Sequence, residues 1–348
     1  MSRVAVTGIS GYIAQRLLEH LESDDSIERI VGIDCVEPKS KSKKLEFHLM
    51  DIRDPELPQV LKGSDTVVHL AFVLNPMQDE QLMRDINVNG SKNVFDSAAE
   101  AGVKKIVYTS SIVAYGARPD NPEFLTEESP LRANPDFNYA EHKLEVELFI
   151  QRWRKDHPDI KVVVLRPAIV FGPHVQNFIS RTLEAPRVLA VSGYKPPFQF
   201  VHEEDAAAAI YFAVERDLDG AYNVCPDDYL EWDEVLEIAG KKPLALPEGV
   251  MLPLAKIAWK LGLVEAPAGE VAYLMYPAIM SNKKIKEAGF EFRHSSRDAL
   301  VETIEATRDW VTIGRWRMRR EQYHARLRGF AAALGLLFAI YVARKIAR

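Results

Sequence analysis

Short apolar runs alternate with amphipathic stretches along the first half of the chain. Six runs are rich in Val, Ile and Leu, and they occupy residues 3–8, 27–34, 44–52, 65–72, 103–111 and 160–167. Most are apolar at consecutive positions, as strands buried on both faces of a parallel sheet are. Helically spaced apolar residues follow in between, notably at 12–23, 81–101 and 138–155. This alternation predicts an α/β fold with a Rossmann-type, doubly wound parallel sheet.

The pattern changes near residue 172, where prolines become frequent and apolar helices are separated by loops. We expect helices at 231–239, 250–262 and 267–275. They predict a smaller C-terminal substrate lobe over the carboxyl ends of the strands, where such sheets bind ligands. The expected domains are a cofactor domain at 1–172 with a return segment at about 199–223, a lobe mainly at 173–310, and a basic, apolar tail at 311–348.

Composition and charge narrow the functional classes. The chain has 348 residues and two cysteines, Cys35 and Cys225, too few for a disulfide framework. Its first residues lack an apolar signal segment, which favours a cytoplasmic protein. The net charge is −6, yet nine basic side chains and a single glutamate follow residue 314. An acidic body disfavours nucleic-acid binding, whereas the basic end suits anionic lipid headgroups.

A glycine-rich turn joins the first strand to the first helix in "TGISGYIA". Gly8 permits a tight turn, Gly11 lets the backbone approach a pyrophosphate, and Ala14 is small enough for helix–strand packing. Backbone amides at the helix start would hold the phosphates. The predicted cofactor-binding residues of this loop are Gly8, Ser10, Gly11, Tyr12 and Ile13.

Asp34 ends the second strand, where a carboxylate can bind an adenosine ribose and repel a 2′-phosphate. It therefore favours NAD over NADP. Four lysines follow closely and leave NADP open, although a solvated loop is their simpler interpretation: Lys39, Lys41, Lys43 and Lys44.

Tyr139 and Lys143 are four residues apart in "NYAEHK" and share one face of a helix. A tyrosine with an ordinary pKa of about 10 is a poor base at neutral pH. A neighbouring ammonium stabilises the phenolate and makes it usable for acid–base chemistry on a hydroxyl or carbonyl. A serine at the end of the fifth strand, Ser111 or its neighbour Ser110, could position the same substrate oxygen.

These motifs, in this order, resemble the extended short-chain dehydrogenase/reductase family of NAD-dependent epimerases and dehydratases, over residues 1 to about 310. The resemblance implies Ser111, Tyr139 and Lys143 as the catalytic set, and it places no metal in the site. It also implies cofactor contacts from Asp51 and Ile52 in "MDIRD", Leu70 and Ala71 in "HLAF", Asn87 in "NVNGSKNV", Tyr139, Lys143, and Pro167 in "LRPAIVFGP". A homodimer through 81–101 and 138–155 is expected from the resemblance alone.

Two departures from the family concern the substrate. Members that act on nucleotide sugars usually carry an asparagine where this chain has Ile169, and often an arginine where it has Phe198. Both changes remove donors for a diphosphate. "RPAIVFGP" also resembles the 3β-hydroxysteroid dehydrogenase branch, and the lobe helices are rich in large apolar side chains, which favours a sterol- or lipid-like substrate. Helices that merely pack on their own core would explain the same composition.

Two other functions stay open at this point. A nucleotide-sugar epimerase or dehydratase with tightly bound NAD would need other diphosphate contacts, for which Arg181 and Arg187 are candidates. A non-catalytic NAD-responsive binding protein would not need Ser111, Tyr139 and Lys143 together.

The end of the chain contains fourteen uncharged residues, 330–343, between Arg328 and Arg344. As a helix they would span roughly 21 Å, short of a bilayer core of about 30 Å. Aromatic and arginine residues precede them, as is typical of a membrane interface. We expect residues 329–348 to associate with a membrane; a buried helix or an oligomer contact is the alternative.

Overall fold

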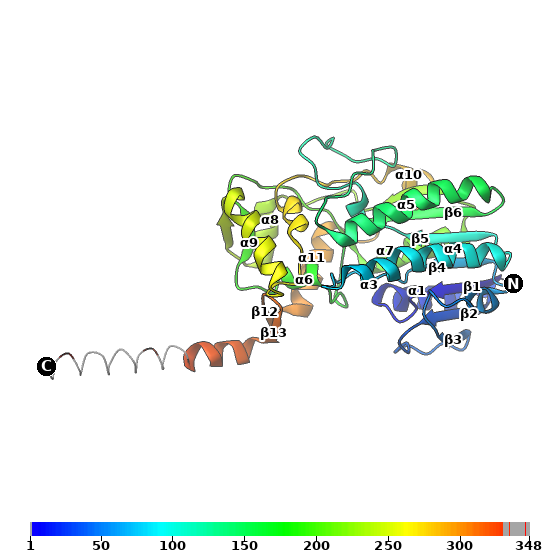
Figure 1. Cartoon of the computed structure of the whole chain (residues 1–348), viewed down its shortest axis with the longest axis horizontal. Helices are drawn as coiled ribbons and strands as arrows, with labels where there is room; N and C mark the ends of the chain where they lie inside the picture. The colour runs from blue at the N-terminus through cyan, green and yellow to red at the C-terminus, as the bar shows by residue number, and fades with distance from the viewer. Residues whose placement is uncertain (1, 330–333, 335–344, 346–348) are drawn as a thin grey trace.

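A seven-stranded parallel sheet forms the centre of the molecule (Figure 1). The computed structural model describes residues 2–329 together with residues 334 and 345. The strand order is β10-β6-β5-β4-β1-β2-β3, so the winding reverses between β1 and β4. This confirms the doubly wound α/β fold. The strands are β1 Ser2–Thr7, β2 Ile27–Asp34, β3 Leu45–Leu49, β4 Thr66–His69, β5 Lys105–Thr109, β6 Lys161–Pro167 and β10 Gly220–Val224.

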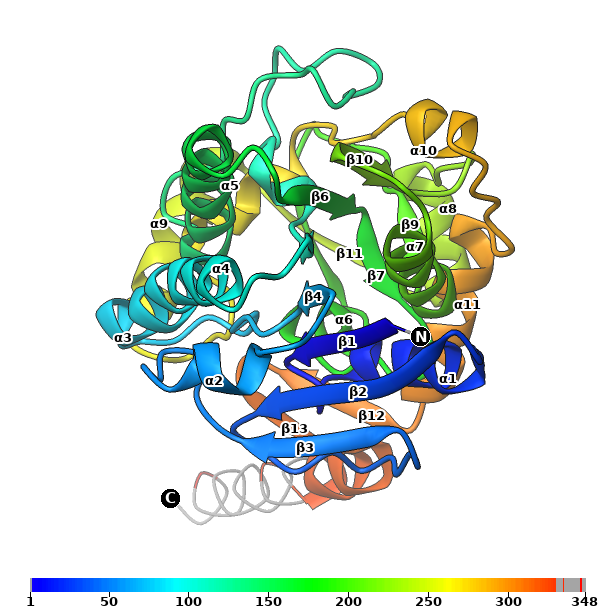
Figure 2. The same ribbon diagram turned by 90° about the vertical axis from the view of Figure 1, so that its right-hand side faces the viewer.

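Helices cover both faces of the sheet, which explains the unbroken apolar runs. In Figure 2 one face carries α1 (Tyr12–Ser23) and α7 (Glu203–Glu215), and the other carries α4 (Gly90–Glu100) and α5 (Asn138–Asp156). The short helix α2 (Leu57–Leu61) packs beside α4. Every residue of β4 is buried, as expected for a central strand between two helical layers.

The segment predicted as one helix at 81–101 is not uniform. It begins as α3 (Glu80–Arg84), widens into a π-helical turn at Asp85–Asn89, and continues as α4. Wide turns of this kind often lie at functional sites. Here the turn carries Asn87, whose side chain is fully buried.

The second half of the chain builds a smaller lobe beyond the carboxyl ends of the strands. Its strands pair as β7 (Ile169–Phe171) with β9 (Phe200–His202), and β8 (Val188–Val191) with β11 (Pro243–Leu246). Segment 267–275 forms a 3-10 helix at Ala268–Leu274, with a second such turn at Ile112–Ala114. The α-helices are α6 Phe178–Thr182, α8 Trp232–Ala239, α9 Glu248–Lys260, α10 Lys283–Glu287 and α11 Ser296–Thr307. The domain boundaries given above stay a prediction.

A β-hairpin of β12 (Trp310–Ile313) and β13 (Trp316–Arg319) follows the lobe and leads into a helical stretch at 320–329. Among the described residues, no helix is long and apolar enough to cross a membrane. Most of the predicted membrane segment, 329–348, lies outside the described residues.

Candidate active site

The glycine-rich turn lies where the strand order reverses. Gly8 follows β1 with φ +75°, a conformation that favours glycine. A Cβ on Gly8 would lie 2.6 Å from the backbone N of Ala71, after β4, and one on Gly11 would lie 3.2 Å from the Gly8 carbonyl oxygen. Gly11 precedes α1, and no described side chain caps its first amides. The turn therefore offers the bare backbone that a pyrophosphate requires.

Asp34 lies beside this turn, at the end of β2. Its Oδ2 accepts a hydrogen bond from the Ser10 backbone N–H at 3.0 Å, and its Oδ1 accepts one from the Val36 N–H at 3.2 Å. The carboxylate thus holds the backbone of the glycine-rich turn. Lys44 donates to the Asp24 carbonyl instead, at 2.7 Å, which directs one of the four lysines to another part of the surface.

Asp51 and Ile52 follow β3. The Arg53 guanidinium binds the Asp51 carboxylate at 2.6 Å and holds the pKa of that carboxyl below its usual range. Ile52 is buried beneath Gly90, where an added Cβ would lie 2.6 Å from the Ile52 Cδ1. The Asp51 carboxylate is therefore bound by Arg53, and the Ile52 side chain packs against the start of α4 at Gly90.

Asn87 fixes the loop after β4, which contains Leu70 and Ala71. Its Oδ1 accepts from the Val73 N–H at 2.7 Å, and its Nδ2 donates to the Val73 carbonyl at 3.0 Å. Because both ends of the amide are bound to the loop backbone, Asn87 fixes the position of this loop.

Tyr139 and Lys143 lie on α5 and are brought to the glycine-rich turn. The Lys143 Nζ donates to the Thr109 carbonyl at 2.7 Å and lies 3.6 Å from the centroid of the Phe72 ring. Phe72 in turn packs edge-on against Tyr139, at 5.7 Å between centroids. Lys143 is almost fully buried, with 3 % of its surface exposed.

The two serines after β5 have different partners. Ser111 lies close enough to Tyr139 for its side chain to lower the pKa of the phenol, and its Oγ accepts from the Val113 N–H at 3.3 Å. Ser110 donates to Glu147 at 2.5 Å, within a buried ion pair of Glu147 and Arg166 at 2.6 Å. Ser111 is therefore the serine that borders Tyr139, whereas Ser110 belongs to the core.

Burial dominates the charge states of the pair on α5. Desolvation raises the pKa of Tyr139 to about 12, whereas the neighbouring Ser111 side chain lowers it. Desolvation also lowers the pKa of Lys143 to about 7, against the nearby Glu147 that raises it. In this environment Tyr139 holds its proton, and Lys143 can change charge near neutral pH.

The remaining predicted residues surround this centre. Tyr12 begins α1, and burial and the proximity of Tyr139 raise its pKa, whereas the nearby Asn177 side chain lowers it. Ile13 packs on the core below the turn, and Pro167 is the buried last residue of β6. Tyr12, at the start of α1, thus contributes an aromatic wall near Tyr139.

An apolar cavity of about 500 Å³ lies beside this centre, between the sheet and the lobe. The 3-10 turn after Ser111 forms one wall through Ile112 and Val113, and the lobe supplies aromatic and aliphatic side chains such as Phe198, Trp232 and Met251. Tyr273 reaches across, with its hydroxyl donating to the Val113 carbonyl at 3.3 Å. The cavity can receive a large apolar group, and one of its lining residues, Phe137, packs against Tyr139 with centroids 5.9 Å apart.

Both departures from the nucleotide-sugar pattern line this cavity. Ile169 belongs to β7, and Phe198 packs against Phe200 and Trp232 with centroids 6.1 Å and 5.7 Å apart. Arg181 and Arg187 border the same cavity. Arg181 is paired with Glu265 at 2.6 Å, whereas Arg187 is exposed and has no ion pair within the described part of the chain.

Glu270 was not predicted from the sequence. It lies in the 3-10 helix of the lobe and lines the cavity, close enough to Tyr273 for the two groups to influence each other. The residue is half-buried and borders the cavity, and desolvation raises the pKa of its carboxyl to about 8. Nothing in "APAGEVAYL" signals this, because the burial depends on how the lobe closes over the sheet.

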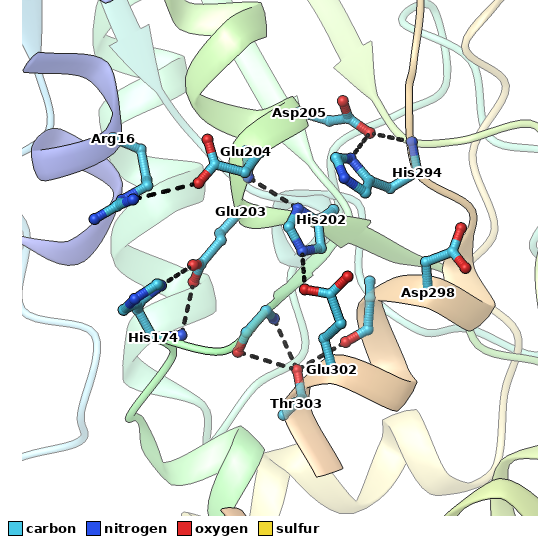
Figure 3. A network of polar contacts seen from close by, with 12 residues as sticks. Arg16, His174, His202, Glu203, Glu204, Asp205, His294, Asp298, Glu302 and Thr303 are labelled. Carbon is cyan, nitrogen blue, oxygen red and sulfur yellow. Dashed lines mark hydrogen bonds and ion pairs between the residues drawn. The ribbon is translucent and has the colours of Figure 1, made fainter. Parts of the chain in front are cut away.

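A polar network at the start of α7 joins this helix to the lobe (Figure 3). His202 accepts from the Glu204 N–H at 3.2 Å through Nδ1, lies 3.2 Å from Glu302, and stacks on His294 at 3.9 Å between centroids. His294 contacts Asp205 at 3.2 Å. These bonds tie α7 to α11.

Among known proteins, residues 4–225 match the NAD dependent epimerase/dehydratase family. The chain belongs to this family. Its members are NAD-dependent enzymes, which agrees with the bare turn at Gly8 and the carboxylate of Asp34. Groups of histidine, cysteine and acidic side chains that could hold a metal are absent from the described residues.

Three relatives illustrate its range. An uncharacterised protein of Mycobacterium tuberculosis strain H37Rv is 26 % identical over 85 % of this chain and 81 % of its own length. Cinnamoyl-CoA reductase 1 of Petunia hybrida is 28 % identical over 88 % of this chain and 92 % of its own. The structure of Thermus thermophilus UDP-glucose 4-epimerase with NAD has a TM-score of 0.68 and 22 % identity, over 88 % and 99 %, which shows a shared fold.

Proposed function

We propose that the protein is an NAD-dependent enzyme that transfers hydride at a carbon bearing a hydroxyl or carbonyl group, with Tyr139 as its acid–base residue. The observation that carries this proposal is the convergence of Ser111, Tyr139 and Lys143 beside the bare glycine turn at the switch point of the sheet. When bound there, NAD would accept or return the hydride.

The chain's own residues would handle the proton. The Ser111 hydroxyl would hold the substrate oxygen, and Tyr139 would exchange a proton with the same oxygen. Lys143 is anchored on the Thr109 carbonyl, and its positive charge would stabilise the Tyr139 phenolate. The cofactor would be held by the turn at Gly8 and Gly11, with Asp34 at the ribose end and further contacts from Asp51, Ile52, Leu70, Ala71, Asn87 and Pro167.

The relatives and the cavity support different substrates. Nucleotide-sugar enzymes such as the Thermus epimerase share the fold, and this supports an epimerase or dehydratase reaction better than a sterol dehydrogenase. Arg187 is the available contact for a phosphate in that case. The apolar lining around Phe198 and Ile169 supports a second candidate, a dehydrogenase for a hydrophobic alcohol in the manner of the 3β-hydroxysteroid dehydrogenase branch.

Retention of the cofactor separates the two candidates. The purified protein is desalted exhaustively and denatured, and the supernatant is assayed for NAD. Near-stoichiometric NAD supports the epimerase or dehydratase, because such enzymes regenerate the cofactor in place. A protein that is empty but binds added NAD reversibly supports the dehydrogenase, which must release the reduced cofactor after each turnover.

The chemistry is tested with Tyr139→Phe, which removes only the reacting hydroxyl. With a panel of nucleotide sugars and hydrophobic alcohols, turnover of any accepted substrate should fall by about 10²-fold or more, while NAD affinity stays unchanged. Tyr211→Phe is the control, because it removes a hydroxyl that binds Asp24 on the outer side of α7. Full activity in Tyr139→Phe would exclude the proposed acid–base role.

A further inference from the structure

Helix α9 exposes an apolar stripe that has no cover among the described residues. Val250, Ile257 and Leu261, on and just after the helix, are 51 %, 58 % and 65 % exposed. Their spacing of seven and four residues places them along one side of the helix. Met251, at the next position, is 3 % exposed and faces the cavity. The helix is thus apolar on its outer as well as its inner side.

The tip of the β12–β13 hairpin extends this stripe. The Arg315 N–H donates to the Leu263 carbonyl at 3.1 Å, so the hairpin is bound to the loop that follows α9. Leu263, Ile313 and Trp316 are 44 %, 44 % and 55 % exposed beside this bond. The stripe and the hairpin tip together form what we call the α9 surface: Val250, Ile257, Leu261, Leu263, Ile313 and Trp316.

Basic side chains accompany the α9 surface. Lys260 and Arg315 are exposed at its centre, with no ion pair in the part of the chain that the structure describes, whereas Lys256 is paired with Asp136 at 2.9 Å. Glu248, at the start of the helix, is engaged by the Tyr194 hydroxyl at 3.0 Å. More arginines follow from the last residue of β13 onward: Arg319, Arg320, Arg326 and Arg328.

The inner side of the same helix lines the apolar cavity through Ala255 and Ala258, and Gly314 of the hairpin tip also borders it. Leu254 borders the cavity too, yet it is 51 % exposed and lies between Val250 and Ile257 on the outer stripe. Helix α9 therefore lies between the cavity and the α9 surface, and Leu254 contacts both. A molecule dissolved in an apolar phase at this surface would be one helix diameter from the cavity.

We propose that the α9 surface docks onto a lipid bilayer that contains anionic headgroups. Apolar side chains at the centre, unpaired cations among them and an exposed tryptophan are the features of an interfacial membrane site. The chain also continues from this hairpin through 320–329 on the same side of the molecule (Figure 1) into the uncharged sequence 330–343. A second copy of the chain would instead bring Lys260 and Arg315 against like charges.

The test is co-sedimentation of the full chain with vesicles of phosphatidylcholine, with and without phosphatidylserine. Ile257→Glu with Leu261→Glu is the test variant, and Leu49→Glu on β3 is the control, because Leu49 is equally exposed at 67 % but lies on the far edge of the sheet. Lys260→Gln with Arg315→Gln tests the charge. NAD binding and thermal unfolding verify that each variant is folded.

Wild type and Leu49→Glu should bind phosphatidylserine vesicles equally, and the double glutamate variant should bind at least tenfold more weakly. Each removed cation should weaken binding about fivefold on phosphatidylserine vesicles, and less on phosphatidylcholine alone. Unchanged vesicle binding in the double glutamate variant would assign any membrane contact to 330–343 and overturn the proposal. If light scattering without lipid shows a dimer for wild type and a monomer for the double glutamate variant, the α9 surface is a contact between copies of the chain. That result would also overturn the proposal. None of these results depends on the proposed chemistry.

Discussion

Replacing Glu270 with glutamine should change how the stability of the protein depends on pH. Glu270 is half-buried in the lobe and borders the apolar cavity, and desolvation raises the pKa of its carboxyl from about 4.5 to about 8. Glutamine has nearly the same shape, but its neutral amide does not titrate. The comparison therefore isolates the cost of holding a carboxylate in this position.

The direction in which stability changes with pH follows from how this carboxyl is protonated in the folded and in the unfolded chain. Below about pH 4.5 the carboxyl is neutral in both the folded and the unfolded chain, so its charge costs nothing. Between pH 4.5 and 8 the unfolded chain ionises first, and the free energy of unfolding falls as the pH rises. A difference of about 3.5 pKa units corresponds to about 5 kcal/mol at most. Because cavity water can solvate the carboxylate, we expect between about 2 and about 5 kcal/mol.

Urea unfolding of wild type and Glu270→Gln at several pH values from 5 to 9 measures this effect. The difference between the two free energies removes the contributions of all other groups, including Lys143. We expect glutamine to gain at least about 2 kcal/mol over wild type between the lowest and highest pH. A difference that stays constant within about 0.5 kcal/mol would refute the inference that Glu270 is desolvated.

Two other substitutions test the frame of the site. Gly8→Ala should abolish NAD binding and destabilise the fold by about 1–3 kcal/mol, because φ is +75° and the new Cβ would lie 2.6 Å from the Ala71 nitrogen. Calorimetry measures the NAD affinity, and thermal unfolding measures the stability. An unchanged NAD affinity would contradict a tight turn at Gly8. Arg166→Met should lower the free energy of unfolding, measured with urea, by about 3–5 kcal/mol, because it leaves the Glu147 carboxylate without its ion-pair partner at 3 % exposure. A loss below about 1 kcal/mol would show that the ion pair is dispensable.

Local sequence chemistry determined the sheet and the cofactor turn. Strands such as β4 are apolar at successive positions because helices cover both faces, and that pattern is visible without knowing which helices they are. Gly8 and Gly11 are likewise local, since a positive φ and a close backbone approach exclude most other residues. The four-residue spacing that places Tyr139 and Lys143 on one helical face is also a property of the sequence alone.

Contacts between distant segments decided the rest. Ser110 and Ser111 are adjacent at a strand end, so their side chains point in different directions, but only the packing of α5 shows that Glu147 receives one and Tyr139 the other. The sequence also could not reveal that Glu270 would be desolvated, or that α9 would be apolar on a side with no cover. Those properties arise when the lobe closes over the sheet, because burial depends on neighbours that are far away along the chain.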